Sequence, residues 1–226
     1  MWTPHVNYPV SDRAREVYGG RNFNGYGLGW GTTEYHGKQM VSHTGGYDGM
    51  YSAVTMLPTE KIGVVILTNT MDGIGTLLSY EIIDRLLGLP QQDWKNRGIN
   101  QDKGHWADRA ARIKERTDAR IMGTKPSMDV VAISGLYRCP LFGDIRILEE
   151  NGKLTIDFVH SPQLKARLSH WHNDTYQLEW LEEQAWFEFG TVQIQMNNSG
   201  KPSGLLFDVP NDDIFFEEIK AVRVTP

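Results

Sequence analysis

Hydrophobic and polar positions alternate along most of the chain, in the short pattern expected of β-strands. The runs YSAVTML at 51–57 and IGVVILTN at 62–69 are separated by the four residues Pro58–Lys61. This break predicts a hairpin, because a proline cannot donate to a strand ladder. Residues 62–67 are apolar almost throughout, which indicates a central strand covered on both faces.

Residues 73–89 follow a different, helical period. Apolar side chains at spacings of three and four predict one amphipathic helix, which we expect to lie on the sheet. Asp72 is a suitable N-cap, and Gly88 and Pro90 mark the end of the helix. The expected buried stripe consists of Leu78, Ile82, Ile83, Leu86, Leu87 and Leu89.

The pattern changes again after residue 90. Residues 91–104 are polar without apolar periodicity and predict a linker or surface crossing. Residues 105–122, rich in alanine and arginine, predict an exposed helix. Acidic residues interrupt its basic residues, which favours a solvated face. These basic residues are Arg109, Arg112, Lys114, Arg116 and Arg120.

Beyond Ser134, short β-type runs recur about every ten residues and are joined by turn segments such as ENGK and NNSGK. Many short strands at this spacing indicate an antiparallel barrel or sandwich. The runs are GLYRC, GDIRILEE, KLTIDFVH, KARLSHWH, TYQLEW, AWFEFG, TVQIQMN, GLLFDV and IFFEEI.

Composition excludes several classes of protein. Of the 226 residues, 40% are hydrophobic and 23% charged, so a core can form and wholesale disorder is excluded. No apolar run reaches the ~18–20 residues of a membrane span, and residues 1–10 do not have the pattern of a secretion signal. The net charge of −5 argues against a nucleic-acid partner. The one cysteine, Cys139, excludes an intrachain disulfide and a cysteine metal cluster, and we expect no cofactor.

The candidate chemistry lies in the sequence His43-Thr44-Gly45-Gly46. Taken alone, H-T-G-G is a weak signal, because a glycine pair after a strand is more often a turn. Its context is more specific: YGLGW precedes it, and GMYSAVTMLP, EKIGVVILTN and an amphipathic helix follow. This order resembles the C-terminal part of the serine β-lactamase and penicillin-binding-protein superfamily, in its class C-like branch, over about residues 1–90.

The resemblance implies a role for each of these residues. In that family a K/H-T/S-G triplet lies on the strand that edges the active site. Gly46 N–H would be one of two oxyanion-hole donors, and the Thr44 hydroxyl would contact a substrate carboxylate or carbonyl. His43 stands where the family usually has lysine, which lowers the fixed positive charge. Tyr47, Asp48 and Tyr51 either border a substrate cleft or form an ordinary polar turn.

Other elements of the family pattern are missing from this sequence. None of its serines has a lysine three positions later, and no Y-x-N or S-x-N is present. The resemblance therefore predicts the C-terminal part of a serine hydrolase that acts on an amide, ester or β-lactam in the full-length protein, with a small-molecule or peptide substrate. Without a nucleophile, this chain alone is expected to be inactive.

Residues 123–220 resemble the lipocalin-like β-barrel appended to many such hydrolases, most specifically at HWHNDTY. The expected class is thus α+β: a partial antiparallel sheet plus helix from a β-lactamase/transpeptidase-like domain, followed by an antiparallel lipocalin-like β-barrel. The expected parts are 1–90, a linker with an exposed helix at 91–127, and the barrel at 128–226. Whether Met1 is a true start stays open. Relatives are usually periplasmic or secreted, but the compartment of this chain stays open.

Three alternatives remain. His170 and His172 alternate along one predicted strand and would share a face, near His160 on a neighbouring strand, so they could supply half of a zinc site. A structural network of these histidines is the favoured interpretation. The barrel aromatics either line a ligand cavity or fill the interior.

The alternative to a hydrolase fragment is a different class of function, in which the chain is a ligand- or partner-binding module that uses the barrel. The incomplete sheet, with an open edge, predicts a homo-oligomer.

Overall fold

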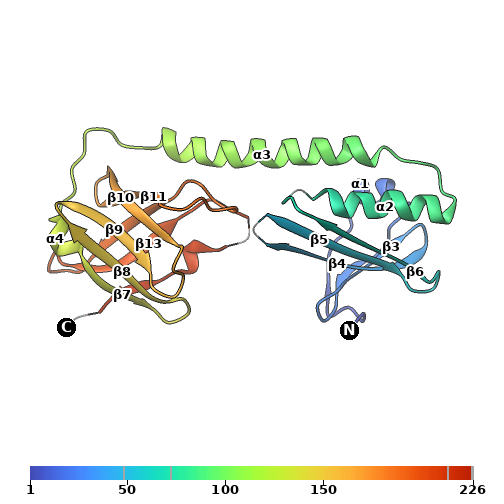
Figure 1. Cartoon of the computed structure of the whole chain (residues 1–226), viewed down its shortest axis with the longest axis horizontal. Helices are drawn as coiled ribbons and strands as arrows, with labels where there is room; N and C mark the ends of the chain where they lie inside the picture. Colours follow the sequence, from blue (N-terminus) through green and yellow to red (C-terminus); the bar gives the residue numbers. More distant parts are fainter. Residues whose placement is uncertain (48, 72, 213, 225–226) are drawn as a thin grey trace. The chain divides into compact units, whose positions relative to one another are not determined.

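A computed structural model describes residues 1–47, 49–71, 73–212 and 214–224. The chain divides into two compact units, Met1–His105 and Trp106–Pro226 (Figure 1). The boundary falls within helix α3, which spans Trp94–Asp118. None of the described helices is long and apolar enough to cross a membrane.

The first unit contains an antiparallel sheet whose strands are neighbours in sequence order, β1 to β6. The predicted four-residue hairpin is confirmed, because Leu57 pairs with Ile62. A tighter turn, His36–Gly37, joins β3 and β4, and both residues have positive φ, 49° and 74°. The strands are β1 Val6–Asn7, β2 Asn24–Tyr26, β3 Gly31–Tyr35, β4 Lys38–Tyr47, β5 Met50–Leu57 and β6 Ile62–Thr68.

The prediction of a central, doubly covered strand at residues 62–67 is wrong. In the described sheet β6 is the last strand, paired with β5. Val64 is buried toward the helix side, whereas Val65 and Leu67 are 62% and 77% exposed on the other face. An apolar run therefore marks an edge strand here, with one face covered and one open.

Helix α2, Ile74–Leu87, confirms the predicted amphipathic helix and packs on the sheet (Figure 1). Its C-cap is Gly88 in the left-handed conformation, as expected. The expected N-cap, Asp72, lies outside the described residues. The predicted stripe is partly wrong, because Leu78 and Leu86 are 40% and 60% exposed. The buried face instead carries Leu77, Tyr80, Ile83 and the carboxylate of Asp84.

Helix α3 begins at Trp94, well before the helix that the pattern indicates at 105–122. Two residues explain the earlier start. The Asp93 carboxylate accepts a hydrogen bond from the Asn96 backbone N–H, in the manner of an N-cap. Trp94 is 2% exposed and anchors the first turn to the core of the first unit. A short helix, α1 at Asp12–Val17, lies between β1 and β2 in the sequence and is capped by the Ser11 hydroxyl.

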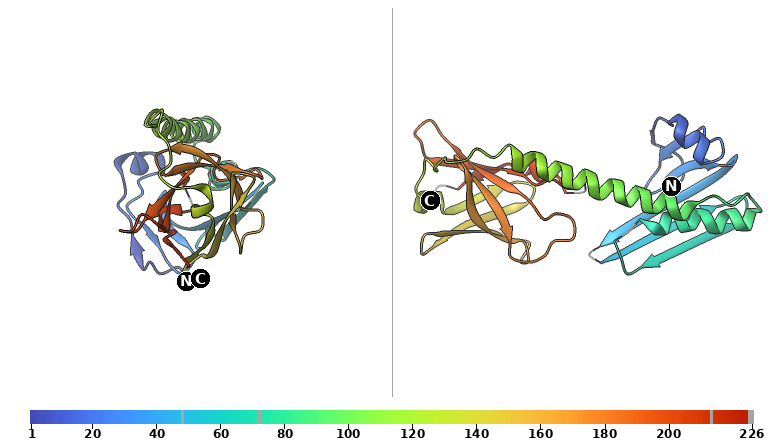
Figure 2. Two further views of the ribbon diagram at one scale, coloured as in Figure 1. Left: turned by 90° about the vertical axis from the view of Figure 1, so that its left-hand side faces the viewer. Right: turned by 90° about the horizontal axis from the view of Figure 1, so that it is seen from above.

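The second unit is a closed antiparallel barrel in the order β10-β11-β12-β13-β14-β7-β8-β9 (Figures 1 and 2). This confirms the expected α+β class and the barrel. Two predicted strands are wrong: residues 185–190 form no strand, and residues 216–218 form a 3-10 helix before the last strand. The strands are β7 Gly135–Cys139, β8 Gly143–Glu150, β9 Lys153–Phe158, β10 Lys165–His172, β11 Thr175–Trp180, β12 Thr191–Met196, β13 Pro202–Asp208 and β14 Ala221–Arg223, with α4 at Val130–Ile133.

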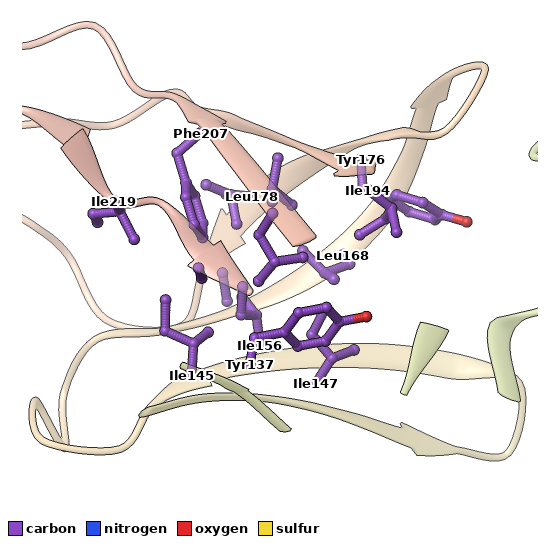
Figure 3. Close-up of a cluster of buried hydrophobic side chains, with 14 of the residues drawn as sticks. Tyr137, Ile145, Ile147, Ile156, Leu168, Tyr176, Leu178, Ile194, Phe207 and Ile219 are labelled. Atoms are coloured by element: carbon purple, nitrogen blue, oxygen red, sulfur yellow. The ribbon is translucent and has the colours of Figure 1, made fainter. Parts of the chain in front are cut away.

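Side chains fill the barrel interior (Figure 3). Inward positions alternate along each strand, so that Ile145 and Ile147 of β8 face the same interior as Ile194 and Leu178 from the opposite wall. Phe187, Phe207 and Phe216 belong to this buried cluster, and Trp180 and Trp186 pack against it. The barrel aromatics therefore serve mainly as core packing.

The predicted solvated face of the arginine-rich helix is only partly confirmed within the second unit, because Lys114 is exposed whereas three arginines are engaged. Arg116 forms an ion pair with Asp208 at the end of β13, with Nη2 2.9 Å from the carboxylate. Arg112 forms a second ion pair, to Asp212, at 2.7 Å. Arg109 is 9% exposed and lies beside the ring of Trp106. These contacts dock the C-terminal half of α3 on the barrel wall.

Candidate active site

The four residues of the H-T-G-G motif lie on the part of β4 that extends beyond the end of β3. β3 pairs with β4 only from Tyr35 opposite Lys38 to Gly31 opposite Ser42. β5 continues to pair with β4 as far as Tyr47 opposite Met50. Residues 43–47 are thus paired by β5 on one side, while β3 has ended on the other. We call this segment the free edge of β4.

The register determines which backbone groups face this edge. A two-residue turn makes its flanking residues, Tyr35 and Lys38, a hydrogen-bonded pair. In an antiparallel ladder such pairs alternate, so Ser42 also directs its N–H and C=O toward β3. By the same alternation, the N–H and C=O of Thr44 and Gly46 are directed past the end of β3. The free edge therefore presents two N–H donors and two carbonyl acceptors.

His43 is exposed and held by an aromatic neighbour. Its Nε2 lies 3.0 Å from the hydroxyl of Tyr26, and the tautomer determines which of the two donates. The rings of Tyr26 and Trp30 lie 6.2 and 6.4 Å from the imidazole, centroid to centroid. Both residues come from the YGLGW segment. The sequence pattern contained this signal, because that segment immediately precedes the strand, but it did not identify Tyr26 as the partner of His43.

The first glycine of the motif, Gly45, leaves little room for a side chain. At Gly45 a side chain would place its Cβ 3.1 Å from Ser52 Oγ, whose hydroxyl donates to the Gly45 carbonyl at 3.3 Å. Gly46 lies opposite Tyr51, and the Tyr51 hydroxyl is 3.3 Å from Thr76 Oγ1. Thr44 and Tyr47 are exposed. Asp48 lies outside the described residues, so the suggestion that it borders a cleft with its neighbours stays a prediction.

The structure separates two of the histidines that sequence reasoning placed together. A register shift between His170 and His172 sets them opposite Tyr176 and Thr175, which lie on opposite faces of β11. The expectation that they share a face is therefore wrong. His160 follows β9 and is not on the strand, and a Cβ at Gly143 would lie 2.3 Å from its ring. Within the described ranges, no cluster of three or more His, Cys, Asp or Glu is placed to hold a metal ion.

The histidines instead make single hydrogen bonds of a structural kind. His170 Nε2 lies 2.8 Å from the Asn173 carbonyl. His172 Nδ1 accepts from the backbone N–H of Ile121 at 3.2 Å. Asp174, on the same hairpin, accepts from both the hydroxyl and the N–H of Ser127. The bonds from Ile121 and Ser127 attach the segment after α3 to the β10–β11 turn.

Comparison with protein families divides the chain in the same way. Residues 8–86 match the family described as β-lactamase. Residues 119–223 match one described as a domain of unknown function, DUF3471. The resemblance of the first unit to β-lactamase-like hydrolases is confirmed by this match.

Two curated relatives match part of the chain. An unguisins hydrolase of Aspergillus violaceofuscus is 41% identical over 71 residues, which is 30% of this chain and 12% of that protein. An unguisins hydrolase of Aspergillus campestris is 35% identical over 75 residues, 30% of this chain and 14% of that protein. The chain therefore spans only a small part of the length of these relatives.

Solved structures show a weaker similarity. The octameric penicillin-binding protein homologue from Pyrococcus abyssi has a TM-score of 0.36 and 14% identity, over 99% of this chain and 40% of that one. SurE with D-Leu has a TM-score of 0.33 and 14% identity, over 88% of this chain and 39% of that one. TM-scores of this size do not establish a common arrangement of the whole chain.

Proposed function

We propose that this chain, in which residues 8–86 are a segment of the β-lactamase family, supplies one wall of an acyl-transfer site to a serine hydrolase. The observation that carries the proposal is the free edge of β4, which combines the H-T-G-G residues with backbone donors that no strand among the described residues pairs with. An extended substrate backbone can pair with such an edge as an additional strand. The proposed substrate class is an amide, an ester or a β-lactam.

The groups at the free edge of β4 have the chemical properties that acyl transfer requires. When a serine oxygen attacks a carbonyl carbon, the carbonyl oxygen gains negative charge and needs N–H donors aimed at it. The N–H of Gly46 is directed at the free edge, and the missing side chain lets a carbonyl approach closely. The Thr44 hydroxyl can donate to a substrate carboxylate or carbonyl. His43, oriented by Tyr26, adds a hydrogen-bonding group without the permanent charge of lysine.

The chain alone is expected not to catalyse this reaction, because its sequence has no S-x-x-K nucleophile and no Y-x-N or S-x-N element. The test is incubation of the purified chain with nitrocefin and with p-nitrophenyl acetate. Turnover should not exceed that of a heat-denatured sample. If turnover occurs and one Ser→Ala substitution abolishes it, this part of the proposal is wrong.

A chimera tests the positive part of the proposal. Residues 8–86 of this chain, which match the β-lactamase family, would replace the corresponding segment of the Aspergillus violaceofuscus unguisins hydrolase, a relative 41% identical over 71 residues. The chimera should hydrolyse the relative's substrate. Gly46→Ala should lower kcat/KM about 10²-fold by displacing the reacting carbonyl. Gly63→Ala on β6 is the matched control, because its Cβ would meet only Met56 Cγ, at 4.0 Å. Equal effects of the two substitutions would contradict the proposal.

The open face of the sheet supports a proposed homo-oligomer. Side chains on the face away from α2 include Val65 and Leu67 of β6 and Met50 of β5, which are 62%, 77% and 55% exposed. The β6 backbone is also unpaired on its outer side within the described sheet. Exposed apolar side chains beside an open strand edge favour association. We expect a second copy of this chain to cover the surface unless the remainder of a larger hydrolase already covers it.

A further inference from the structure

A pocket of about 310 Å³ lies on the outer surface of the barrel, over strands β10–β13 and beside the last turn of α3. All of its lining residues belong to the second unit. It is separate from the packed interior of Figure 3, because its floor is made by outward-facing positions of β11 and β12. Its size is at the lower end of the range of small-molecule sites.

The floor of this outer pocket carries two hydroxyls without hydrogen-bond partners. Thr175 and Thr191 are 8% and 9% exposed, and their strand neighbours Tyr176 and Val192 point into the barrel. Among the described residues, neither threonine hydroxyl has a hydrogen-bond partner. Both hydroxyls are open to the pocket, so water satisfies them in the free chain, and a ligand that enters can replace that water with its own donors and acceptors.

The other polar groups of the pocket carry no free charge. The Arg116 guanidinium donates from Nε to both carboxylate oxygens of Asp208, at 2.9 Å each, so the two charges neutralise each other. Gln193 contributes an amide with both donor and acceptor. His172 accepts at Nδ1 from Ile121, which leaves Nε2 as the N–H donor. The pocket therefore offers neutral donors and acceptors.

An apolar wall stands beside these polar groups. Trp171 is 7% exposed, with the Arg120 guanidinium 4.3 Å from its ring and the ring of Phe189 at 5.5 Å. Ala119, Leu206 and Phe207, the last of which also belongs to the barrel core, complete the apolar part of the lining. The indole is thus held rigidly at the pocket by its neighbours.

These features discriminate between classes of ligand. Among the described residues that line the pocket, an anion would find no cation free of a carboxylate, because Arg116 is engaged by Asp208. A hydrocarbon chain would leave the two hydroxyls unsatisfied. A peptide backbone would find no strand edge, because β11 and β12 are paired on both sides. A sugar ring has hydroxyls for the floor and C–H groups for the indole. We propose that the outer pocket binds a neutral saccharide.

The test is a titration of the full ¹⁵N-labelled chain with two neutral probes, maltotriose and N,N′,N″-triacetylchitotriose. With at least one of them, amide shifts should concentrate at residues 171–175 and 191–193 and give a dissociation constant below about 10 mM. No saturable shift with either probe would overturn the proposal. An equal shift at the same amides with trialanine or with inorganic phosphate would also overturn it.

Variants place the binding at the floor. Thr191→Val keeps the branched shape and removes the hydroxyl, so affinity should fall about tenfold, the effect of one hydrogen bond. The unliganded variant should melt no lower than the parent, because no partner is lost. Gln193→Ala should also weaken binding, whereas Gln195→Ala, two residues along the same outward face, should not. Equal affinity in Thr191→Val, Gln193→Ala and the parent would contradict the proposal. The result does not depend on the proposed acyl-transfer role, because the pocket uses the second unit alone.

Discussion

The indole Nε1 of Trp94 donates to the buried carboxylate of Asp84 at 2.7 Å. The same carboxylate, 1% exposed, also accepts from the hydroxyl of Tyr35. The three residues come from the start of α3, from α2 and from β3. One acid thus ties the sheet, the covering helix and the first turn of the next helix together.

We expect Asp84→Ala to destabilise the first unit by about 2–4 kcal/mol, because it leaves two buried donors unpaired. Hydrogen exchange of α2 amides measures this, since it reports the free energy of opening of the first unit separately from the barrel. Glu81→Ala is the control on the same helix. Glu81 forms only a partly exposed pair with Arg85, at 2.8 Å, and its loss should cost about 0.5 kcal/mol or less. A similar loss in both variants would exclude a special role for Asp84.

This acid also explains why the sequence predicted the helix but not its buried face. The apolar period identified α2 and its Gly88 end correctly. It could not indicate that Asp84 points inward, because a carboxylate is buried only when partners elsewhere in the chain satisfy it. Those partners, Tyr35 and Trp94, lie 49 and 10 residues away in sequence. The exposed positions Leu78 and Leu86 were therefore assigned to the core in error.

At the candidate site, too, the sequence predicted the strand but not the tertiary arrangement around it. The order of the motif and strands predicted that residues 43–46 lie on a strand, and they do. The free edge depends on where β3 ends opposite Ser42, which is a matter of register. No local pattern gives that end point. The bulge that separates His170 from His172 was invisible for the same reason, because a single inserted residue changes the face of every later side chain.

Two tyrosines of the barrel should respond in opposite ways to loss of their hydroxyls. The Tyr137 hydroxyl donates to the Ile133 carbonyl at 2.7 Å and receives a bond from Arg223. The Tyr176 hydroxyl is buried without a partner among the described residues. We expect Tyr137→Phe to cost about 1–2 kcal/mol and Tyr176→Phe to be neutral or stabilising. Thermal unfolding of the two variants compares them directly, and a larger loss in Tyr176→Phe would contradict the assignment.

Both units should lose stability in alkaline solution. Burial, with a smaller effect of Asp174, raises the pKa of Tyr176 to about 12. Burial, together with the bond to Asp84, raises the pKa of Tyr35 well above its usual range. In the unfolded chain tyrosines ionise near pH 10, so above that pH the unfolded state loses protons that the folded state retains. The stabilisation is complete below about pH 10 and declines above it.

Urea unfolding at pH 9, 10, 11 and 12 measures this decline. In Tyr176→Phe the fall in barrel stability between about pH 10 and 12 should be shallower than in the parent, because one linked proton is removed. Tyr8→Phe, at an exposed site, is the control and should leave the slope unchanged. If the slope of Tyr176→Phe equals that of the parent, Tyr176 is not the linked group.

The proposed association of the first unit should depend on the side chains of β6. Leu67 is 77% exposed beside the open edge, so Leu67→Lys adds a charge that self-association would have to bury. We expect the parent to be a dimer or larger by light scattering at micromolar concentration, and the variant to shift toward the monomer. Val131→Lys, at a 63% exposed site on the second unit, is the matched control and should keep the parent's state. A monomeric parent would refute the association. An equal shift in both variants would place the interface elsewhere.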